Sequence, residues 1–280
     1  NYEFQSRYSN PNLNFSLFNE NIFYLNDKLS LVPGLRFEYI RTSSNGFYRN
    51  INTDNAGNVI LNEIIYSEPT ARVRSFLLYG IGLSYNLFDW SEFYSNYSKN
   101  YRAVTFADIN VVSPNFIINP NIKDESGYTI DAGFRGDYKK IIFYDLSSFY
   151  LFYNDRIGFV QRALDDGRVK NEKNNVGDAL IYGQECLINL NVTNFLINSN
   201  NLKINCFVNF SKINSEYVSS DVNGVEGNNV EFVPNINLKT GLKFDFKKMK
   251  FKFQYTYLSN QFTDASNSIE SDLSGVIGQI

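Results

Sequence analysis

Histidine is absent from the 280-residue chain, and cysteine, methionine and tryptophan are nearly so, with 2, 1 and 1 residues. Without histidine the chain has no Ser-His or Cys-His nucleophilic dyad and no histidine-ligated metal site. Paired acids remain at Asp124-Glu125 and Asp165-Asp166, but adjacent acids in polar segments are more often solvated turn residues. We therefore expect no enzyme, no catalytic residue, no metal and no cofactor.

Long apolar runs are also missing. A transmembrane helix needs about 18 consecutive apolar residues, and the richest stretch, Ile141 to Tyr153, is interrupted by Asp145 and Ser147. The mean hydropathy is −0.30 although 43% of the residues are hydrophobic. Apolar and polar side chains are therefore interleaved, which excludes a helical membrane protein.

The charge balance argues against nucleic-acid binding, and the two cysteines give no sign of a metal site. A net charge of −3, from 26 basic and 29 acidic residues, provides no basic surface for nucleic acid. Cys186 and Cys206 fall on the apolar faces of consecutive predicted strands, without the spacing of metal ligands. We expect small lipid-facing or packed side chains there, with a disulfide as the less favoured alternative.

What the chain does contain is aromatic residues, 25 Phe and 20 Tyr, in period-two alternation that predicts β-strands. From Val73 to Leu87 one face is apolar, and the other carries Arg72, Arg74, Gly80 and Gly82. The segments Tyr128 to Tyr138 and Leu238 to Phe246 repeat this pattern. Each strand thus has one apolar face and one face of polar or small residues.

Turns divide the chain into about ten strands, each long enough to cross a bilayer. Short polar turns are expected near residues 26–28, 89–91, 138–140, 198–200 and 247–249. Long polar segments alternate with them, at residues 45–70, 104–124, 163–177 and 219–231. Short turns at one end and long loops at the other are typical of a transmembrane antiparallel β-barrel meander. The predicted fold is therefore all-β, a partial barrel with short periplasmic turns and long extracellular loops.

A weak internal repeat accompanies these strands. One glycine recurs about every 50 to 60 residues in strands that lead into a short turn, where strand glycines mark a bend or a close approach; they are Gly82, Gly133, Gly183 and Gly241. We interpret them as sites of barrel curvature.

Motifs in order along nearly the whole chain carry a resemblance to a known family. FNENIF at residues 18–23 and LSLVPGLRFEYI at residues 29–40 resemble its strand pair "F-x-E-N-I-F … P-G-x-R-x-E". The remaining motifs are Tyr97 to Asp108, Asn121 to Tyr128, Tyr153 to Gly158 and Asn175 to Asp178. The series resembles the barrel region of TonB-dependent outer-membrane receptors of the ferric-dicitrate type.

The resemblance implies a longer protein with an N-terminal plug domain and a barrel of about twenty-two strands. Residues 1–280 would be part of that one barrel domain, with the plug and the final strands absent. An incomplete barrel leaves open strand edges that lipid cannot hydrogen-bond. We therefore expect that the chain alone does not insert stably.

The resemblance also implies a function. It predicts TonB-energised uptake of an iron chelate, ferric citrate or another siderophore, in the outer membrane of a Gram-negative bacterium. The expected partners are outer-membrane lipid, TonB through the missing plug and the nutrient ligand, with a monomer at full length and no nucleic acid. Two alternatives stay open, a porin-like passive channel and a surface β-rich adhesin or carbohydrate-binding protein.

Arginines on the predicted polar face are the candidate substrate-binding residues, because a ring of cations attracts an anionic chelate. The alternative is that they pair with lumen acids such as Glu38, Asp131 and Asp137, or with the plug. The candidates are Arg36, Arg72, Arg74, Arg102 and Arg135.

Overall fold

The structure is a computed structural model that describes residues 4–53, 56–110, 116–164, 167, 169–197 and 202–271. In these residues thirteen strands form one sheet, and β14 (Gln261–Phe262) pairs with β15 (Glu270–Ser271) separately. The sheet runs through β1 (Ser6–Ser9), β4 (Leu29–Thr53), β5 (Val59–Phe88), β6 (Ser91–Arg102), β8 (Glu125–Tyr138), β9 (Ile142–Ala163), β10 (Val169–Asn191), β11 (Leu202–Ser219), β12 (Ile236–Phe246) and β13 (Met249–Leu258). Off this path, β2 (Asn12–Glu20) and β3 (Phe23–Tyr24) pair with β4, and β7 (Phe116–Ile118) pairs with β10.

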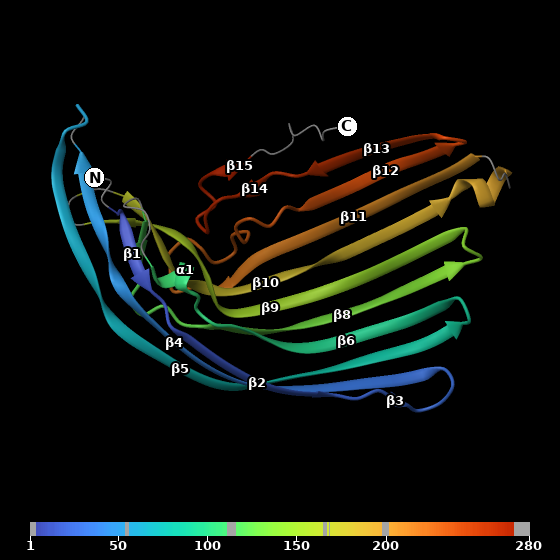
Figure 1. The fold of residues 1–280 in the computed structure, drawn as a ribbon, viewed down its shortest axis with the longest axis horizontal. Helices are drawn as coiled ribbons and strands as arrows, with labels where there is room; N and C mark the ends of the chain where they lie inside the picture. Colours follow the sequence, from blue (N-terminus) through green and yellow to red (C-terminus); the bar gives the residue numbers. More distant parts are fainter. Residues whose placement is uncertain are drawn as a thin grey trace.

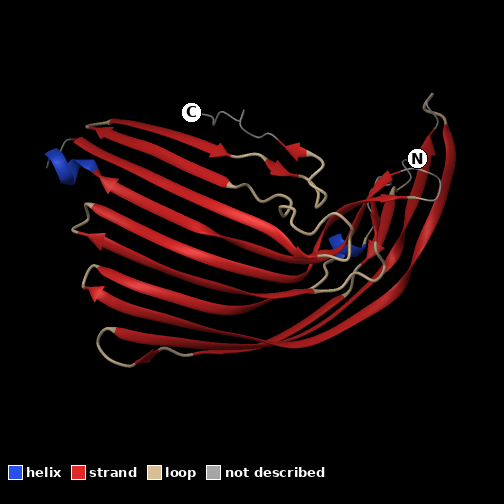
Figure 2. Ribbon diagram, turned by 180° about the vertical axis from the view of Figure 1, so that it is seen from behind, coloured by secondary structure: helices blue, strands red, loops and turns tan. Residues whose placement is uncertain are grey.

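Strands that follow one another in the sequence lie side by side in a single bent sheet (Figures 1 and 2). Pairing is antiparallel throughout the described sheet except between β7 and β10. Ten of its strands have nine residues or more. The predicted antiparallel meander of about ten long strands is therefore confirmed.

Helix is almost absent. The described residues contain one helical turn, α1 (Phe106–Ile109), and one short π-helix, η1 (Thr193–Ile197). No helix in the described part of the chain is long and apolar enough to span a membrane.

Short turns gather at one end of the sheet, as predicted (Figure 1). Only Asp89 and Trp90 separate β5 from β6, and only Lys247 and Lys248 separate β12 from β13. Lys139 and Lys140 join β8 to β9 with φ angles of +54° and +55°, the conformation of tight hairpin turns that match the strand twist. The turn expected at 198–200 lies outside the described residues.

Two of the predicted long loops are wrong. Most of 45–70 belongs to β4 and β5, which have 25 and 30 residues, and most of 163–177 belongs to β9 and β10. Their polar residues indicated loops, but pairing between neighbouring strands and β-branched residues such as Val59 and Ile64 outweigh that composition. The β4–β5 hairpin therefore extends well past the other strands at the loop end, with β1 added along its edge (Figure 1).

The register aligns one apolar residue from each of nine consecutive strands in a row. The row comprises Leu29, Tyr85, Phe93, Phe134, Leu146, Cys186, Phe210, Leu238 and Tyr257. We call the face that carries this row the outer face. Its large side chains are widely uncovered, with Phe253 63% and Leu35 54% exposed. An apolar surface of this extent on a water-soluble monomer would be unusual.

The adjoining row, one residue along each strand, points to the opposite side, which we call the inner face. It comprises Ser30, Ser84, Tyr94, Gly133, Ser147, Glu185, Ser211, Asn237 and Leu258. The predicted division into an apolar and a polar or small face is thus confirmed. Cys186 and Cys206 are free thiols, and no disulfide joins them.

The buried core lies where loops fold onto the inner face at the loop end. Val160, Val176, Ala179 and Tyr217 pack there beneath the segment between β11 and β12. A smaller cluster contains Val104, Ile122 and Ile157. The middle of the sheet has no such core, because no second sheet of similar size packs against it among the described residues.

Close approach of a neighbouring side chain explains three of the four repeated glycines. A Cβ on Gly133 would lie 2.6 Å from the Leu146 carbonyl oxygen and 2.7 Å from Tyr94 Oη. Gly183 and Gly241 are similarly crowded, whereas a Cβ on Gly82 would meet nothing nearer than 3.7 Å. Gly133 therefore provides the space in which the Tyr94 ring crosses the sheet.

We expect Gly133→Ala to destabilise the folded barrel by about 1 to 3 kcal/mol, because the added methyl overpacks the site. The measurement is the urea midpoint of the full gene product in detergent micelles. Gly82→Ala is the matched control on the same face, and its midpoint should stay close to wild type. Equal midpoints for the two variants would contradict the role assigned to Gly133.

Candidate functional site

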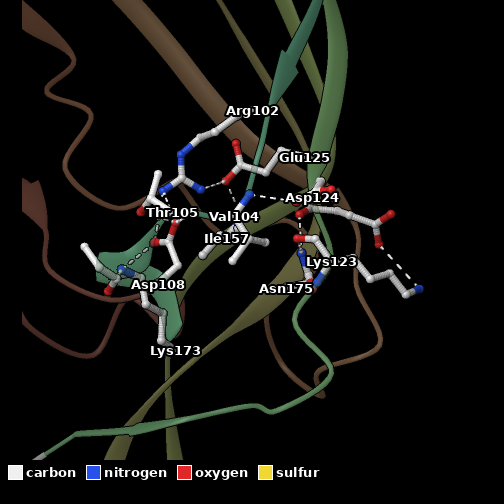
Figure 3. A network of polar contacts seen from close by, with 12 residues as sticks. Arg102, Val104, Thr105, Asp108, Lys123, Asp124, Glu125, Ile157, Lys173 and Asn175 are labelled. Atoms are coloured by element: carbon white, nitrogen blue, oxygen red, sulfur yellow. Dashed lines mark hydrogen bonds and ion pairs between the residues drawn. The ribbon is translucent and has the colours of Figure 1, made fainter. Parts of the chain in front are cut away.

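The candidate site is a polar network at the loop end of the inner face, where the segment between β6 and β8 folds back onto the sheet (Figure 3). At the end of β6, Arg102 donates from Nη2 to both carboxylate oxygens of Asp108, at 3.0 and 2.9 Å. Lys173 of β10 contacts the same carboxylate, with its Nζ 2.7 Å from Oδ1. Asp108 thereby joins β6, α1 and β10.

Local sequence explains how Asp108 reaches this position. Thr105 precedes α1, and its backbone N–H and Oγ1 donate to Asp108 Oδ2 at 2.8 and 2.7 Å, as in a helix capping box. Burial disfavours the charged carboxylate, but the hydrogen bonds from Lys173 and Thr105 and the charge of Arg102 outweigh it and lower the pKa of Asp108 to about 2. Asp108 is therefore ionised at physiological pH.

Asp124 anchors the other end of the same segment. Its carboxylate accepts hydrogen bonds from Arg74 Nε at 2.6 Å, Tyr101 Oη at 2.5 Å and the Val104 backbone N–H at 2.7 Å. Burial opposes ionisation, yet these donors, Arg74 first, lower the pKa of Asp124. Asp124 therefore ties the segment to β5 and β6 together.

Glu125 completes the network at the first residue of β8. It accepts from Arg102 Nη1 at 3.0 Å and from the Ile157 backbone N–H at 2.7 Å, and it is only 3% exposed. The three acids Asp108, Asp124 and Glu125 thus face three cations of the network, Arg74, Arg102 and Lys173. We call these six residues the mouth network, and its charges are balanced.

The structure brings three of the five predicted arginines to this region. Arg102 and Arg74 are members of the mouth network, and Arg72 donates to the carbonyl oxygens of Ile122 at 2.7 Å and Pro120 at 3.4 Å. These arginines hold the segment between β6 and β8 in place. Arg74 has no free surface, since its side chain is 7% exposed.

The other two predicted arginines lie apart from the mouth network. Arg36 pairs with Glu38 on β4, and Arg135 pairs with Glu92, three residues from the end of β8 at the short turns. The five residues therefore do not form a single ring of cations. Four of the five pair with an acid within the chain, as in the alternative that lumen arginines pair with acids, although Arg135 does so with Glu92 and not with Asp131 or Asp137. Arg72 instead donates to backbone carbonyl oxygens.

The sequence analysis missed the acids of this site. Asp124-Glu125 are not solvated turn residues, because each carboxylate is buried against a different arginine. The pair Asp165-Asp166 lies outside the described residues. The capping-box spacing of Thr105 and Asp108 was the one feature of the local sequence that indicated an ordered segment. Other partners of these acids, Arg74 for Asp124 and Lys173 for Asp108, come from strands distant in sequence.

This arrangement is suited to holding a surface in shape. Within the described residues no group of His, Cys, Asp or Glu could hold a metal ion. The pKa values of Asp108 and Asp124 are lowered, which is the opposite of the raised pKa that suits a carboxyl general acid. What the network offers is a rigid inner wall beside the projecting β4–β5 hairpin.

A bent antiparallel sheet with an apolar outer face, short turns at one end and elaborated loops at the other defines the wall of an outer-membrane type β-barrel. The family follows from the sequence, since residues 2–276 match the family described as "TonB dependent receptor-like, beta-barrel". The chain belongs to this TonB-dependent receptor β-barrel family.

Solved structures agree on the fold. The ferric yersiniabactin uptake receptor FyuA from Yersinia pestis is 16% identical with a TM-score of 0.67, over 95% of this chain and 37% of its own. The siderophore receptor PiuA from Acinetobacter baumannii is 14% identical with a TM-score of 0.67, over 95% of this chain and 36% of its own. The ferric citrate transporter FecA is 14% identical with a TM-score of 0.59, over 96% and 45%.

The chain therefore spans less than half the length of these receptors. No curated protein sequence matches the chain. The expected resemblance to the family is confirmed at the level of the family, and the ferric-dicitrate subtype is not distinguished from the receptors of other chelates.

We expect Asp124→Asn to lower the free energy of local opening of residues 103–110 by about 3 kcal/mol, because it leaves the buried Arg74 guanidinium without its charged partner. The measurement is hydrogen exchange at the Val104 and Thr105 amides in the full gene product.

The control is the adjacent Lys123→Gln. Lys123 is 73% exposed and 4.0 Å from Asp155, so its removal should cost no more than about 0.5 kcal/mol. Exchange that is unchanged in Asp124→Asn, or equally faster in both variants, would refute the anchoring role of Asp124.

Proposed function

We propose that this chain is part of the barrel domain of an outer-membrane receptor that takes up an iron chelate, ferric citrate or another siderophore, with energy from TonB. The observation that carries the proposal is the family match over residues 2–276. The fold neighbours named above support it, since they are described as a ferric yersiniabactin uptake receptor, a siderophore receptor and a ferric citrate transporter. The proposal places the protein in the outer membrane of a Gram-negative bacterium.

In this proposal the chain serves as wall and mouth of the transporter, and no bond of the ligand is made or broken. Residues 1–280 belong to one barrel domain, and the plug domain that couples to TonB is a separate part of the full-length, monomeric protein. The outer face contacts lipid through its exposed apolar rows, such as Phe251, Phe253 and Tyr255 on β13. The inner face is left for the plug and the ligand.

We further propose that the ligand contacts those candidate arginines that keep free surface. The side chains of Arg36, Arg135 and Arg102 are 53%, 51% and 41% exposed. A guanidinium has five N–H donors. Arg36 and Arg135 are paired through Nε and Arg102 through its two terminal nitrogens, so each still has N–H donors left for an anion. In this proposal Arg72 and Arg74 do not contact the ligand and instead hold the segment between β6 and β8 in place.

The direct test is uptake of radioactive ferric citrate by cells that express the full gene product and lack their own ferric chelate receptors. We expect uptake at nanomolar iron that disappears when TonB is deleted. Uptake that persists without TonB would instead indicate a porin-like passive channel. Absence of uptake with every iron chelate tested, together with energised uptake of another nutrient, would retain the family and reject iron.

The arginine proposal is tested by a pair of substitutions on β4. Arg36→Gln should raise the ligand concentration for half-maximal uptake by about five- to tenfold, because a charge-assisted hydrogen bond is lost. Glu38→Gln leaves the guanidinium without its acid and should lower that concentration. If both variants move it in the same direction, Arg36 acts on structure and not on the ligand.

An adhesin or carbohydrate-binding protein with a two-sheet core is the weaker alternative. Its inner face would be covered by a second sheet, but the described residues form one large sheet whose buried clusters lie only beneath the loops. No observation favours it over transport.

A further inference from the structure

Two short turns at the rim of the sheet repeat the same sequence pattern, an aromatic residue followed by two lysines. Tyr138-Lys139-Lys140 closes β8 to β9, and Phe246-Lys247-Lys248 closes β12 to β13. In both turns the first lysine has a positive φ angle, +54° at Lys139 and +52° at Lys247. The repeat therefore extends to the backbone conformation of the first lysine, while in the first turn Lys140 also has a positive φ angle, of +55°.

Both turns also use the first lysine in the same way. Lys139 Nζ lies 5.1 Å from the centre of the Tyr138 ring, and Lys247 Nζ lies 5.3 Å from the centre of the Phe246 ring. The two rings belong to the outer face and are 38% and 37% exposed. Each ammonium group is thus held at the end of the apolar surface by a cation–π contact.

The segment between these two turns in the sequence contributes a further aromatic residue next to the first turn. η1 follows β10 at the same end of the sheet (Figures 1 and 2). Asn194 Nδ2 donates to the Lys140 carbonyl oxygen at 3.4 Å, and Phe195 is 62% exposed. We call the residues 138–140, 193–195 and 246–248 the rim patch. It combines four lysines with exposed aromatic rings.

The lysines of the rim patch are not neutralised by the chain. In the part of the chain that the structure describes, no carboxylate lies within ion-pair distance of the four ammonium groups. Asp137 accepts only from the Lys140 backbone N–H, at 3.1 Å, and Asp245 pairs with Lys243. The arginines of the inner face, by contrast, all have partners. The rim patch therefore carries four positive charges that no described carboxylate offsets at ion-pair distance.

The other short turns do not share this chemistry. The turn between β5 and β6 consists of Asp89 and Trp90, and the turn before β4 contains Asp27 beside Lys28. The basic surface is thus a local feature of the β8 to β13 part of the rim, which shows that it does not follow from closing hairpins as such.

We infer that the rim patch binds the headgroups of anionic phospholipids in the leaflet next to the short turns. The inference rests on the membrane placement proposed above. The rings at the end of the outer face then lie at the boundary of the acyl chains, where aromatic side chains are favoured, and the lysines reach the level of the phosphates. A soluble anion could bind the lysines, but it would leave the apolar ring of Phe195 exposed to water.

The test uses the full gene product in nanodiscs that contain phosphatidylethanolamine and phosphatidylglycerol. Native mass spectrometry gives the ratio of the two lipids retained on the protein after release from the disc. We expect wild type to retain phosphatidylglycerol preferentially. Lys139→Gln with Lys247→Gln should reduce that preference at least about fivefold, since each lysine near an anionic surface contributes about that factor.

The matched control is Lys123→Gln with Lys170→Gln, which removes the same charge at the loop end and should leave the ratio unchanged. High salt should reduce the wild-type preference, because the attraction is screened. An unchanged ratio in the rim variant, or an equal loss in the control, overturns the inference and assigns the patch to another occupant.

Failure of the proposed function is read out separately. A protein that shows no heat-dependent gel shift and is not protected by the disc has not inserted, and this would overturn the membrane placement and the inference together. A protein that inserts normally but has no lipid preference overturns the inference alone.

Discussion

The matched register of antiparallel hydrogen bonding between neighbouring strands is the constraint on which the rest of the structure depends. Because side chains alternate between faces with a period of two, a slip of one residue between any two strands would move a row of aromatic residues to the polar side. The register holds from β4 to β13 in nine consecutive strands. It places the apolar residues of all nine strands on the outer face and their polar or small residues on the inner face.

The charged residues at the two ends of the sheet differ in whether they have a partner of opposite charge. At the loop end, three acids and three cations of the mouth network neutralise one another and hold a segment against the inner wall. At two of the short turns, lysines lie over aromatic rings, and no carboxylate of the described residues is within ion-pair distance of their ammonium groups. Paired charges stabilise a surface that has to keep its shape. Unpaired charges at a rim remain available to an external partner, which is why the two ends carry different proposals.

Much of the fold could be predicted from local patterns. The alternation at Val73 to Leu87 gave the faces correctly, and the Tyr138-Lys139-Lys140 turn was found from its polarity. The polar hairpin ends were misjudged, because asparagine-rich strands at 45–70 are stabilised by pairing with each other and with β1, which composition does not show. Asp124 and Glu125 were misjudged for a related reason, as their arginine partners lie far away in the sequence or across a loop.

The sequence by itself determined the class of structure: period-two alternation is a local property, so it survives without knowledge of any partner strand. The absence of histidine likewise excluded histidine-based chemistry without a structure. Only the tertiary structure decided which arginines have free surface, because ion pairs form between residues that the register and the loops bring together. It also decided that the two lysine turns lie along the same rim, since β8 ends at Tyr138 and β12 begins only at Ile236, and the intervening strands of the sheet place their turns at the same end.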